Sequence, residues 1–286
     1  MTTPSQYEGF RERIRANWND EQTIESWRRW HAKVAEQMRS VNDALLSAAH
    51  IRPGIRALDL ASGSGEPALQ IAHAIAPAGT VIATDISGGM LKIARENAEQ
   101  QRLTNISFAP CDAEELPFDD NAFDAVTCRM GAMFFVDLQR ALSEIRRVLR
   151  PGGRAAFAAW GPLERNEFFF SLLQPFFRRI DAPAPPADAP HPFRFSRPDA
   201  LARELRVAQF HDVRESMTDM AAPWPGSPEE AWQVFYEMAA PPFVDELADE
   251  DRRAAIREGI DTLRPLYDGK TINARAAIVL VSGTKR

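Results

Sequence analysis

The feature that most constrains this chain is an apolar segment, 56–59, that ends in an acid and runs into the small-residue stretch Ala61-Ser62-Gly63-Ser64-Gly65. Glycine has no Cβ, so the backbone at Gly63 and Gly65 can come close to a ligand. Pro67 follows where a helix can begin, because its missing N–H leaves nothing unpaired in the first turn. A strand, a tight glycine turn and a helix N-terminus predict a small-molecule site at the edge of a sheet.

Composition limits the kind of protein. The chain has 286 residues, of which 45% are hydrophobic and 26% are charged. These values are typical of a globular protein built as one large domain, or one domain with an elaborated lid. The net charge of −6 disfavours nucleic acid as a partner, because phosphates attract a basic surface. We expect the arginine cluster at 146–154 to be a solvated helix end rather than a binding patch.

The cysteines and the hydropathy pattern indicate a location. Cys111 and Cys128 are the two cysteines, and we expect both to be free thiols in a reducing compartment. No segment approaches the roughly 18 consecutive apolar residues of a membrane span, and the polar segment 1–15 does not resemble a signal peptide. We therefore expect a cytoplasmic protein without a membrane span. No residues have metal-ligand spacing, so we expect no metal.

Strand-like and helix-like segments alternate between residues 51 and 160. The clearest helical stripe runs over 138–149 and stops at Pro151-Gly152-Gly153. Such alternation predicts a parallel sheet with helices on both faces and right-handed crossovers. Ligands bind such sheets outside the carboxyl ends of the strands. The expected strands are 56–59, 81–85, 106–110, 123–128 and 155–160.

Residues 7–49 are expected to be helical. Trp27, Trp30, Val34 and Met38 recur at spacings of three or four, which places them on one face of a helix. That face either packs against the body of the domain or folds over the active site and lends aromatic side chains to it.

The alternation ends after residue 160. The apolar stretch Phe168–Phe177 predicts a helix that is either the core of an insert or a wall of the site. The proline-rich residues 182–190 predict a stiff, extended linker. Further helices are expected over 199–207 and 227–264. Late strands at 213–220 and 276–281 predict an antiparallel edge on the parallel sheet.

Together these segments predict an α/β fold with a Rossmann-like, doubly wound sheet. The sheet is expected to have seven mostly parallel strands and an antiparallel edge strand, with N-terminal helices and a helical insert as a lid. We expect residues 1–49 to form an N-terminal helical cap and residues 50–160 to form a cofactor-binding core. Residues 161–286 are expected to form the helical insert and the late strands that complete the sheet.

The glycine turn fits two kinds of cofactor. Gly63-x-Gly65-x-x-Ala68 formally matches a dinucleotide fingerprint, and Asp85 follows the second strand, where an acid would hold a ribose. Asp59 lies four residues before Gly63, where a carboxylate would disfavour a pyrophosphate and attract an ammonium group. Asp112 follows the third strand, where it would suit an adenine amino group. These two acids favour a cofactor other than a dinucleotide.

Five motifs in a fixed order carry a resemblance to a known family. They are Asp59-x-Ala61-x-Gly63-x-Gly65, Asp85-Ile86-Ser87-x-x-Met90, Cys111-Asp112-Ala113-Glu114-x-Leu116-Pro117-Phe118, Phe123-Asp124-x-Val126 and Leu149-Arg150-Pro151-Gly152-Gly153. Over about residues 50–160 the chain resembles the class I S-adenosylmethionine-dependent methyltransferases, in the branch related to quinone-biosynthesis C-methyltransferases. Ala61 departs from the family, which usually has its first glycine there. Past residue 160 the resemblance is only general, so acceptor specificity is not transferred.

The resemblance implies S-adenosyl-L-methionine as the cofactor. Asp59 and the backbone of the Ala61–Gly65 loop would hold its methionine end, and Arg129 and Met130 would line the methionine or the sulfonium. Asp85 would take the ribose hydroxyls. The residues implied to bind the cofactor are Asp59, Ala61, Gly63, Gly65, Asp85, Ile86, Met90, Cys111, Asp112, Ala113, Arg129 and Met130.

On the adenine side, Ile86 and Met90 would pack against the base, and Asp112 with its two neighbours would bind the amino group. Several of these residues also have a purely structural interpretation. Asp59 can accept backbone N–H groups, and Asp85 and Asp112 can cap the helix or turn that follows. Met90 is also a plausible core residue, and Arg129 can simply pair with a carboxylate.

The implied reaction is an in-line displacement that moves a methyl group to a small acceptor. Apolar segments at 133–135, 160 and 168–177 favour an apolar or aromatic acceptor. Proton removal can require a base, but the sequence assigns no catalytic residue. The alternatives are an NAD(P)-dependent oxidoreductase and a non-catalytic protein that binds S-adenosylmethionine. The candidate bases are His31, His50, His73, His191, His211, Tyr7, Tyr236 and Tyr267.

Overall fold

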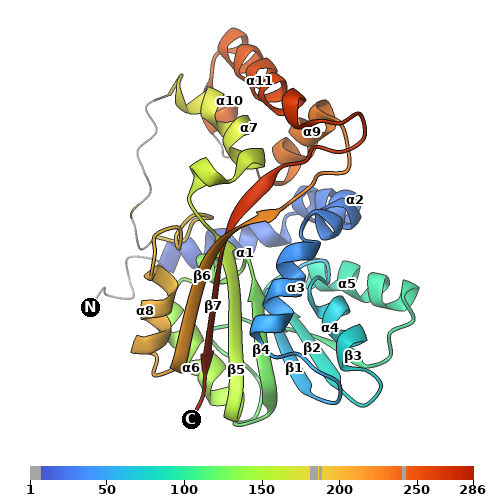
Figure 1. Cartoon of the computed structure of the whole chain (residues 1–286), viewed down its shortest axis with the longest axis vertical. Helices are drawn as coiled ribbons and strands as arrows, with labels where there is room; N and C mark the ends of the chain where they lie inside the picture. The colour runs from blue at the N-terminus through green and yellow to red at the C-terminus, as the bar shows by residue number, and fades with distance from the viewer. Residues whose placement is uncertain (1–7, 181–185, 187–188, 240–242) are drawn as a thin grey trace.

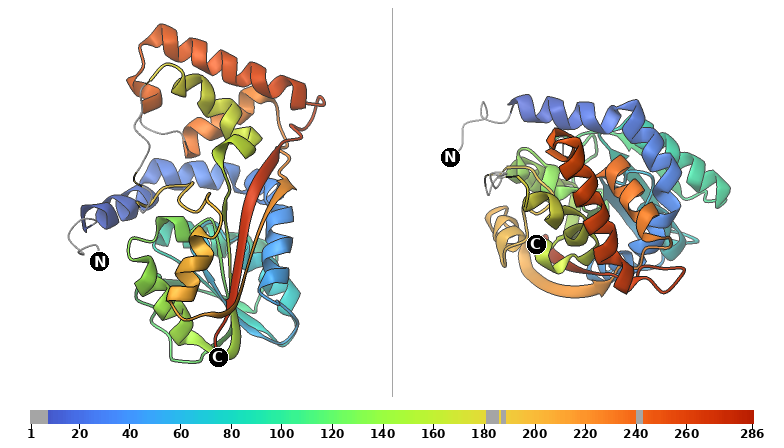
Figure 2. Two further views of the ribbon diagram at one scale, coloured as in Figure 1. Left: turned by 60° about the vertical axis from the view of Figure 1, so that its left-hand side comes forward. Right: turned by 90° about the horizontal axis from the view of Figure 1, so that it is seen from above.

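The computed structural model describes residues 8–180, 186, 189–239 and 243–286. In this part of the chain a seven-stranded sheet has helices against both faces, and a further layer of helices lies above one end of the sheet (Figures 1 and 2). The strands are β1 (Arg56–Leu60), β2 (Thr80–Asp85), β3 (Ile106–Pro110), β4 (Phe123–Arg129), β5 (Leu149–Trp160), β6 (His211–Ala221) and β7 (Arg275–Thr284).

The strand order is β3-β2-β1-β4-β5-β7-β6. All pairs among β1 to β5 are parallel, and β7 is antiparallel to both β5 and β6. The predicted fold is therefore confirmed. The antiparallel strand lies at the expected end of the sheet, one position in from the outermost strand β6. The order reverses between β1 and β4, which is where such sheets bind ligands at the carboxyl ends of their strands.

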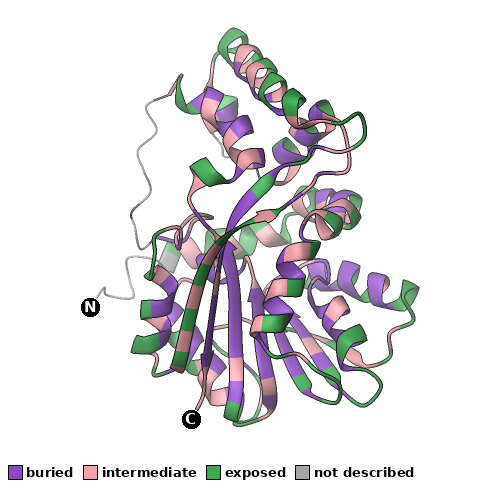
Figure 3. Ribbon diagram, viewed as in Figure 1, coloured by how far each residue is buried: buried purple, intermediate pink, exposed green. Residues whose placement is uncertain are grey.

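Burial explains why the central strands are nearly continuous apolar segments. Both faces of β1 and β4 are covered, and Leu58 and Val126 are fully buried. In β6, by contrast, exposed positions alternate with partly buried ones, as expected for a strand with one solvated face (Figure 3). β5 begins six residues before the expected start, and an irregular register opposite Phe123 and Ala125 accommodates its Pro-Gly-Gly segment.

Helices cover both faces of the sheet (Figure 1). On one face, α3 and α4 pack against alanines and other apolar residues of the central strands, with α5 beside α4. On the other face, α6 and α8 pack against the largest hydrophobic cluster. These helices are α3 (Arg39–Ala48), α4 (Ala68–Ile75), α5 (Gly88–Gln100), α6 (Leu138–Val148) and α8 (Ala200–Val207).

The N-terminal helices α1 (Glu8–Asn19) and α2 (Glu21–Gln37) cross above the carboxyl ends of the strands (Figure 2). Asp20 separates them and caps α2, because its side chain accepts a hydrogen bond from the Thr23 amide at 3.0 Å. The predicted helical character of residues 7–49 is confirmed for the described positions. On the expected apolar face, Trp30 and Met38 are buried against the rest of the protein.

The upper layer contains α7 (Glu167–Phe177), α9 (Pro228–Met238), α10 (Phe243–Glu246) and α11 (Asp249–Leu263). Their apolar faces form two hydrophobic clusters, and the larger one also includes Trp30 of α2. The expected helical segment 227–264 is divided into three helices, and the sequence has two helix-breaking prolines, Pro241 and Pro242, between the first and the second. The expected linker at 182–190 lies largely outside the described residues. No described helix has the length and apolar character needed to cross a bilayer.

Candidate active site

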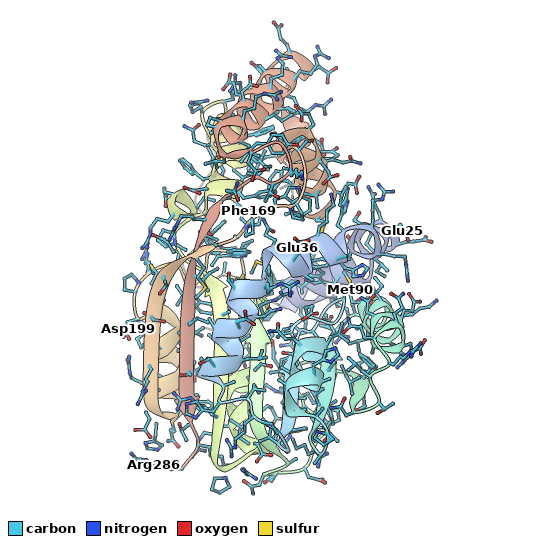
Figure 4. All side chains as sticks on the ribbon, turned by 45° about the vertical axis from the view of Figure 1, so that its right-hand side comes forward. Glu25, Glu36, Met90, Phe169, Asp199 and Arg286 are labelled. Carbon is cyan, nitrogen blue, oxygen red and sulfur yellow. The ribbon has the colours of Figure 1, made fainter. Side chains whose placement is uncertain are left out.

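A cavity of about 1570 Å³ lies between the carboxyl ends of the central strands and the helices above them. Its walls come from α1, α2, the loops after β1 to β5, α7, residues 190–196 and α9. Met90 and Phe169 mark its sheet side and its upper side (Figure 4). Small-molecule sites usually occupy about 300–1000 Å³, so this cavity has room for a cofactor and a second ligand together.

The loop after β1 is held by backbone hydrogen bonds. The Ser62 amide donates to the Thr84 carbonyl and the Gly65 amide donates to the Ser62 carbonyl, each at 2.9 Å. Gly63 has φ +53°, and a Cβ there would meet no atom within 4 Å, which leaves open space beside the backbone. A Cβ at Gly65 would lie 2.8 Å from the Leu69 side chain, so this glycine permits close packing of α4 instead.

Ala61 occupies the position at which the family usually has glycine. Its φ of +52° lies in the left-handed region, where a Cβ costs about 1–2 kcal/mol. The Ala61 methyl group also leaves no room for a side chain at position 131, because a Cβ on Gly131 would lie 2.4 Å from the Ala61 Cβ. The alanine therefore fits this loop at the expense of backbone strain.

Asp85 connects the end of β2 to the glycine loop. Its Oδ2 accepts a hydrogen bond from the Gly63 amide at 2.8 Å, and its Oδ1 accepts one from the Ser87 amide at 2.9 Å. Burial raises the pKa of this carboxyl, and the backbone donors oppose that rise. The side chain lines the cavity, so it presents acceptor oxygens there while it fixes the loop.

Asp59 lies beneath the loop, fully buried, and does not line the cavity. Its Oδ1 accepts from the Thr127 hydroxyl at 2.5 Å, and its Oδ2 accepts from the Ser62 hydroxyl at 2.6 Å. Burial raises the pKa of this carboxyl to about 7, against the effect of the two hydroxyls. The geometry agrees with the structural interpretation of this acid, with hydroxyl groups as donors in place of backbone amides, and does not offer the expected direct contact with a methionine ammonium group.

The residues expected on the adenine side are brought together. Ile86, Met90, Cys111, Asp112 and Ala113 all line the cavity. The Asp112 Oδ1 accepts from the Glu114 amide at 3.0 Å, so this carboxylate also caps the turn. Burial raises the pKa of the Cys111 thiol to about 11, which keeps it protonated. Both cysteines are free, as the sequence predicts.

Glu114 belongs to one of the five motifs, but the sequence analysis assigned it no role. It is 3% exposed, and its Oε1 accepts from the amides of Val136 and Asp137, each at 2.9 Å. Its other oxygen pairs with Arg11 of α1. Glu114 thus joins the loops after β3 and β4 to the N-terminal helix, a long-range contact that no local pattern signals.

Arg129 and Glu66 place opposite charges on the cavity wall. The Arg129 guanidinium donates to the Asn42 Oδ1 at 3.0 Å, and the Asn42 Nδ2 donates to a Glu66 carboxylate oxygen at 3.4 Å. Burial lowers the pKa of Arg129 and raises the pKa of Glu66. Met130 also lines the cavity, as expected, whereas Asn42 and Glu66 were not predicted.

The upper side of the cavity is aromatic. The Phe169 ring lies 5.1 Å from Trp160, 6.5 Å from Phe193 and 6.3 Å from Phe235, measured between centroids. The sequence predicted that Phe168–Phe177 is either the core of an insert or a wall of the site, and different residues of this helix do each. Leu172 and Phe176 are fully buried in the upper helical layer, whereas four others face the cavity. Those four are Phe168, Phe169, Leu173 and Phe177.

The cavity brings only some of the candidate bases near the site. Among the described residues, His191 and Tyr236 line the main cavity, and His31 lines an adjoining cavity of about 160 Å³. The His191 Nδ1 accepts from the Phe193 amide at 3.2 Å, and burial lowers the pKa of this imidazole. Tyr7 lies outside the described residues. The histidines and tyrosines away from both cavities are His50, His73, His211 and Tyr267.

The strand order, and a glycine loop with an acid near the end of each of the first three strands, are typical of Rossmann-like methyltransferases. Residues 17–167 match the ubiE/COQ5 methyltransferase family, and this chain belongs to that family. No group of three or more His, Cys, Asp or Glu residues that could hold a metal ion occurs in the described ranges.

The chain is also similar to individual curated proteins and solved structures. It is 38% identical over 131 residues to the ubiquinone/menaquinone biosynthesis C-methyltransferase UbiE of Burkholderia cenocepacia, covering 44% of this chain and 54% of the relative. The match thus spans about half the length of these curated relatives. The YcgJ protein of Bacillus subtilis has TM-score 0.56 at 22% identity, over 87% of this chain and 99% of that one.

A second solved structure is phosphoethanolamine N-methyltransferase 2 of Haemonchus contortus in complex with S-adenosyl-L-methionine. It has TM-score 0.53 at 18% identity, and the match covers 88% of this chain and 56% of that chain. At these identities the two structures show a shared fold.

Ala61→Gly is expected to raise the free energy of unfolding by about 1 kcal/mol, because glycine relieves the strain at φ +52°. The matched control is Ala125→Gly in β4, which should lower stability, since that residue is buried in an extended strand. Urea denaturation measures both. Equal losses of stability in the two variants would contradict the assignment of strain to Ala61.

Asp59→Asn is expected to change how stability depends on pH. The folded carboxyl has a pKa of about 7, above its ordinary 3.8, so between these values the folded protein binds more protons than the unfolded chain. Wild-type stability should therefore fall relative to that of the variant as pH rises from 4 to 7, by about 1.4 kcal/mol per pH unit, and then level off. Parallel stability curves for the two proteins in urea denaturation would refute the raised pKa.

Proposed function

We propose that this protein transfers a methyl group from S-adenosyl-L-methionine to a small, apolar or aromatic acceptor by in-line displacement. The carrying observation is one continuous cavity whose sheet side is polar and whose upper side is aromatic. Family membership supports the reaction class. The curated relatives are named C-methyltransferases of ubiquinone and menaquinone biosynthesis, which favours carbon as the methylated atom and a quinone-like ring as the acceptor.

The residues on the sheet side fit this cofactor. The open space at Gly63 lets an extended ligand lie against the backbone of the loop. Asp85 would accept hydrogen bonds from the ribose hydroxyls, and Asp112 would accept one from the adenine amino group. Ile86 and Met90 would pack on the base. Bound there, S-adenosylmethionine supplies a methyl group on a positively charged sulfur.

Asp59 is assigned a different role from the one first expected. Its carboxylate would hold the Ser62 and Thr127 hydroxyls, and through them it would fix the loop between β1 and β4. We therefore treat Asp59 as a positioning residue. Ala61, Gly63 and Gly65 would provide backbone contacts, and Cys111, Ala113, Arg129 and Met130 would complete the walls of the cofactor site.

The flanking helices would orient the acceptor and exclude water, which is the main contribution a protein makes to such a displacement. We propose residues 1–49 as a helical cap, and residues 161–286 as a helical insert that forms a lid, with late strands that complete the sheet. Trp18 supports the first assignment, because it lines the cavity and contacts Trp27 and Phe134 at centroid distances of 6.2 and 6.1 Å. The aromatic residues around Phe169 support the second. The protein's own proton acceptor stays unassigned, and a cytoplasmic location remains part of the proposal.

Ligand-dependent thermal unfolding tests the cofactor. S-adenosylhomocysteine should stabilise the protein, by about 2.7 kcal/mol at a hundredfold excess over its dissociation constant, whereas NADH and NADPH should not. Stabilisation by NADH alone would support an oxidoreductase. Labelled methyl transfer from S-adenosylmethionine to apolar molecules of a cell extract then tests catalysis, and binding without transfer would favour a non-catalytic binding protein.

Asp85→Ala is expected to weaken S-adenosylhomocysteine binding at least about 100-fold in calorimetry, because two charge-assisted hydrogen bonds to the ribose are lost. Circular dichroism should show that the variant is still folded. Asp119→Ala removes an exposed carboxylate of the same type and should bind like the wild type. Unchanged affinity in folded Asp85→Ala would show that the ribose lies elsewhere.

A further inference from the structure

Three side chains from distant parts of the chain meet on the cavity wall. Asn42 comes from α3, Glu66 from the loop before α4, and Arg129 from the end of β4. The Asn42 amide accepts from Arg129 through its oxygen and donates to Glu66 through its nitrogen. Asn42 is 2% exposed, so this orientation of the amide is fixed by its surroundings.

Asn42 holds two opposite charges apart. In the described part of the chain, neither Glu66 nor Arg129 takes part in an ion pair, although each affects the pKa of the other by its charge. Arg11 and Glu114, which also line the cavity, form an ion pair with each other. A half-buried charge without an ionic partner is costly, so this arrangement favours a ligand that brings both charges with it.

The location of the pair agrees with the path of a ligand over the glycine loop. Glu66 directly follows that loop, and Arg129 precedes Met130 and Gly131, which line the same cavity. Glu66 and Arg129 also line the adjoining 160 Å³ cavity together with Ser64. Both charges thus border the loop at which the open space beside Gly63 begins.

We infer that Glu66 and Arg129, spaced by Asn42, form a subsite for the zwitterionic amino-acid end of the cofactor. Arg129 donates hydrogen bonds to the α-carboxylate, and Glu66 accepts one from the α-ammonium group. Asn42 is the positioning residue that keeps the two charges separate. This inference rests on the proposed function, since it names the residues that read the methionine end of S-adenosylmethionine.

The same geometry explains why Asp59 is not the ammonium ligand. Both of its carboxylate oxygens accept short hydrogen bonds from hydroxyl groups, and it lies under the loop rather than in the cavity. Glu66, in contrast, has its carboxylate on the cavity wall, where it accepts a hydrogen bond from the Asn42 side chain at 3.4 Å and one from the Gln70 backbone amide. The carboxylate that follows the loop, rather than the one that precedes it, is therefore available to an ammonium group.

Calorimetry with two ligands tests this subsite. S-adenosylhomocysteine carries the amino-acid end, and 5′-methylthioadenosine has the same nucleoside thioether without it. Glu66→Gln should weaken S-adenosylhomocysteine about 10-fold or more and leave 5′-methylthioadenosine within about 2-fold of the wild type. Glu99→Gln, an exposed change of the same kind on α5, should alter neither affinity.

A third ligand distinguishes the contribution of Glu66 from that of Arg129. The decarboxylated analogue of S-adenosylhomocysteine keeps the ammonium group and lacks the carboxylate. Arg129→Gln should weaken S-adenosylhomocysteine about 10-fold or more but bind this analogue like the wild type, whereas Glu66→Gln should weaken both. Binding of 5′-methylthioadenosine by each variant shows that the site is still folded.

The outcomes distinguish this inference from the proposed function. If the wild type binds none of these nucleosides, the proposed function fails. If the wild type binds S-adenosylhomocysteine and Glu66→Gln binds it equally well, the subsite is wrong while the proposed function stands. Equal weakening of S-adenosylhomocysteine and 5′-methylthioadenosine by Glu66→Gln would also overturn the subsite, because Glu66 would then act only through the shape of the loop.

Discussion

The site depends on a buried carboxylate at the end of β1. Asp59 accepts a hydrogen bond from the hydroxyl of Thr127 on the neighbouring strand β4. It accepts another from the hydroxyl of Ser62 in the glycine loop. These hydrogen bonds connect β1 and β4, between which the strand order reverses, to the glycine loop that follows β1. Because a buried carboxyl must have its hydrogen-bonding capacity met, this arrangement has little freedom to shift. Asp85, at the end of β2, accepts a further hydrogen bond from the Gly63 amide of the same loop.

The cavity is closed by segments about 200 residues apart in the sequence. The Trp30 indole donates to Glu237 of α9 at 2.7 Å, and Arg29 donates to the same carboxylate at 3.1 Å. Lys33 pairs with Glu230, also on α9. Exposed ion pairs each contribute little, but here they accompany a buried indole and the packing of α2 against α9. The N-terminal helices and the upper layer thus enclose the site jointly.

The sequence predicted the sheet well, because its strands are buried on both faces and its loops carry glycine, proline and acids at fixed positions. The five strands expected between residues 56 and 160 are present, with β5 beginning six residues early, and the free thiols are confirmed. Ten of the twelve expected cofactor residues line the cavity, although their roles remain predictions; Asp59 and Gly65 do not line it. The placement of Asp59 could not be foreseen, since it depends on Thr127, a partner 68 residues away.

Long-range partners also explain what was missed. Asn42 lies on a helix whose pattern indicates only a packing face, and Glu66 looks like an ordinary acid at the start of a helix. Their place in the cavity wall depends on β4, which brings Arg129 next to Asn42, and Asn42 in turn bonds to Glu66. Likewise, the division of Phe168–Phe177 into buried and cavity-facing residues depends on how α7 is rotated against α9 and α11, which periodicity alone does not specify.

The position of β7 has a consequence for how this protein acquires its structure. β7 lies between β5 and β6, yet it is formed by residues 275–284, more than fifty residues after β6. During synthesis, β5 therefore has an open edge and β6 has no hydrogen-bonding neighbour until this late segment leaves the ribosome. The first five strands lie together earlier in the sequence, whereas the antiparallel part of the sheet can form only once β7 is available to insert between β5 and β6.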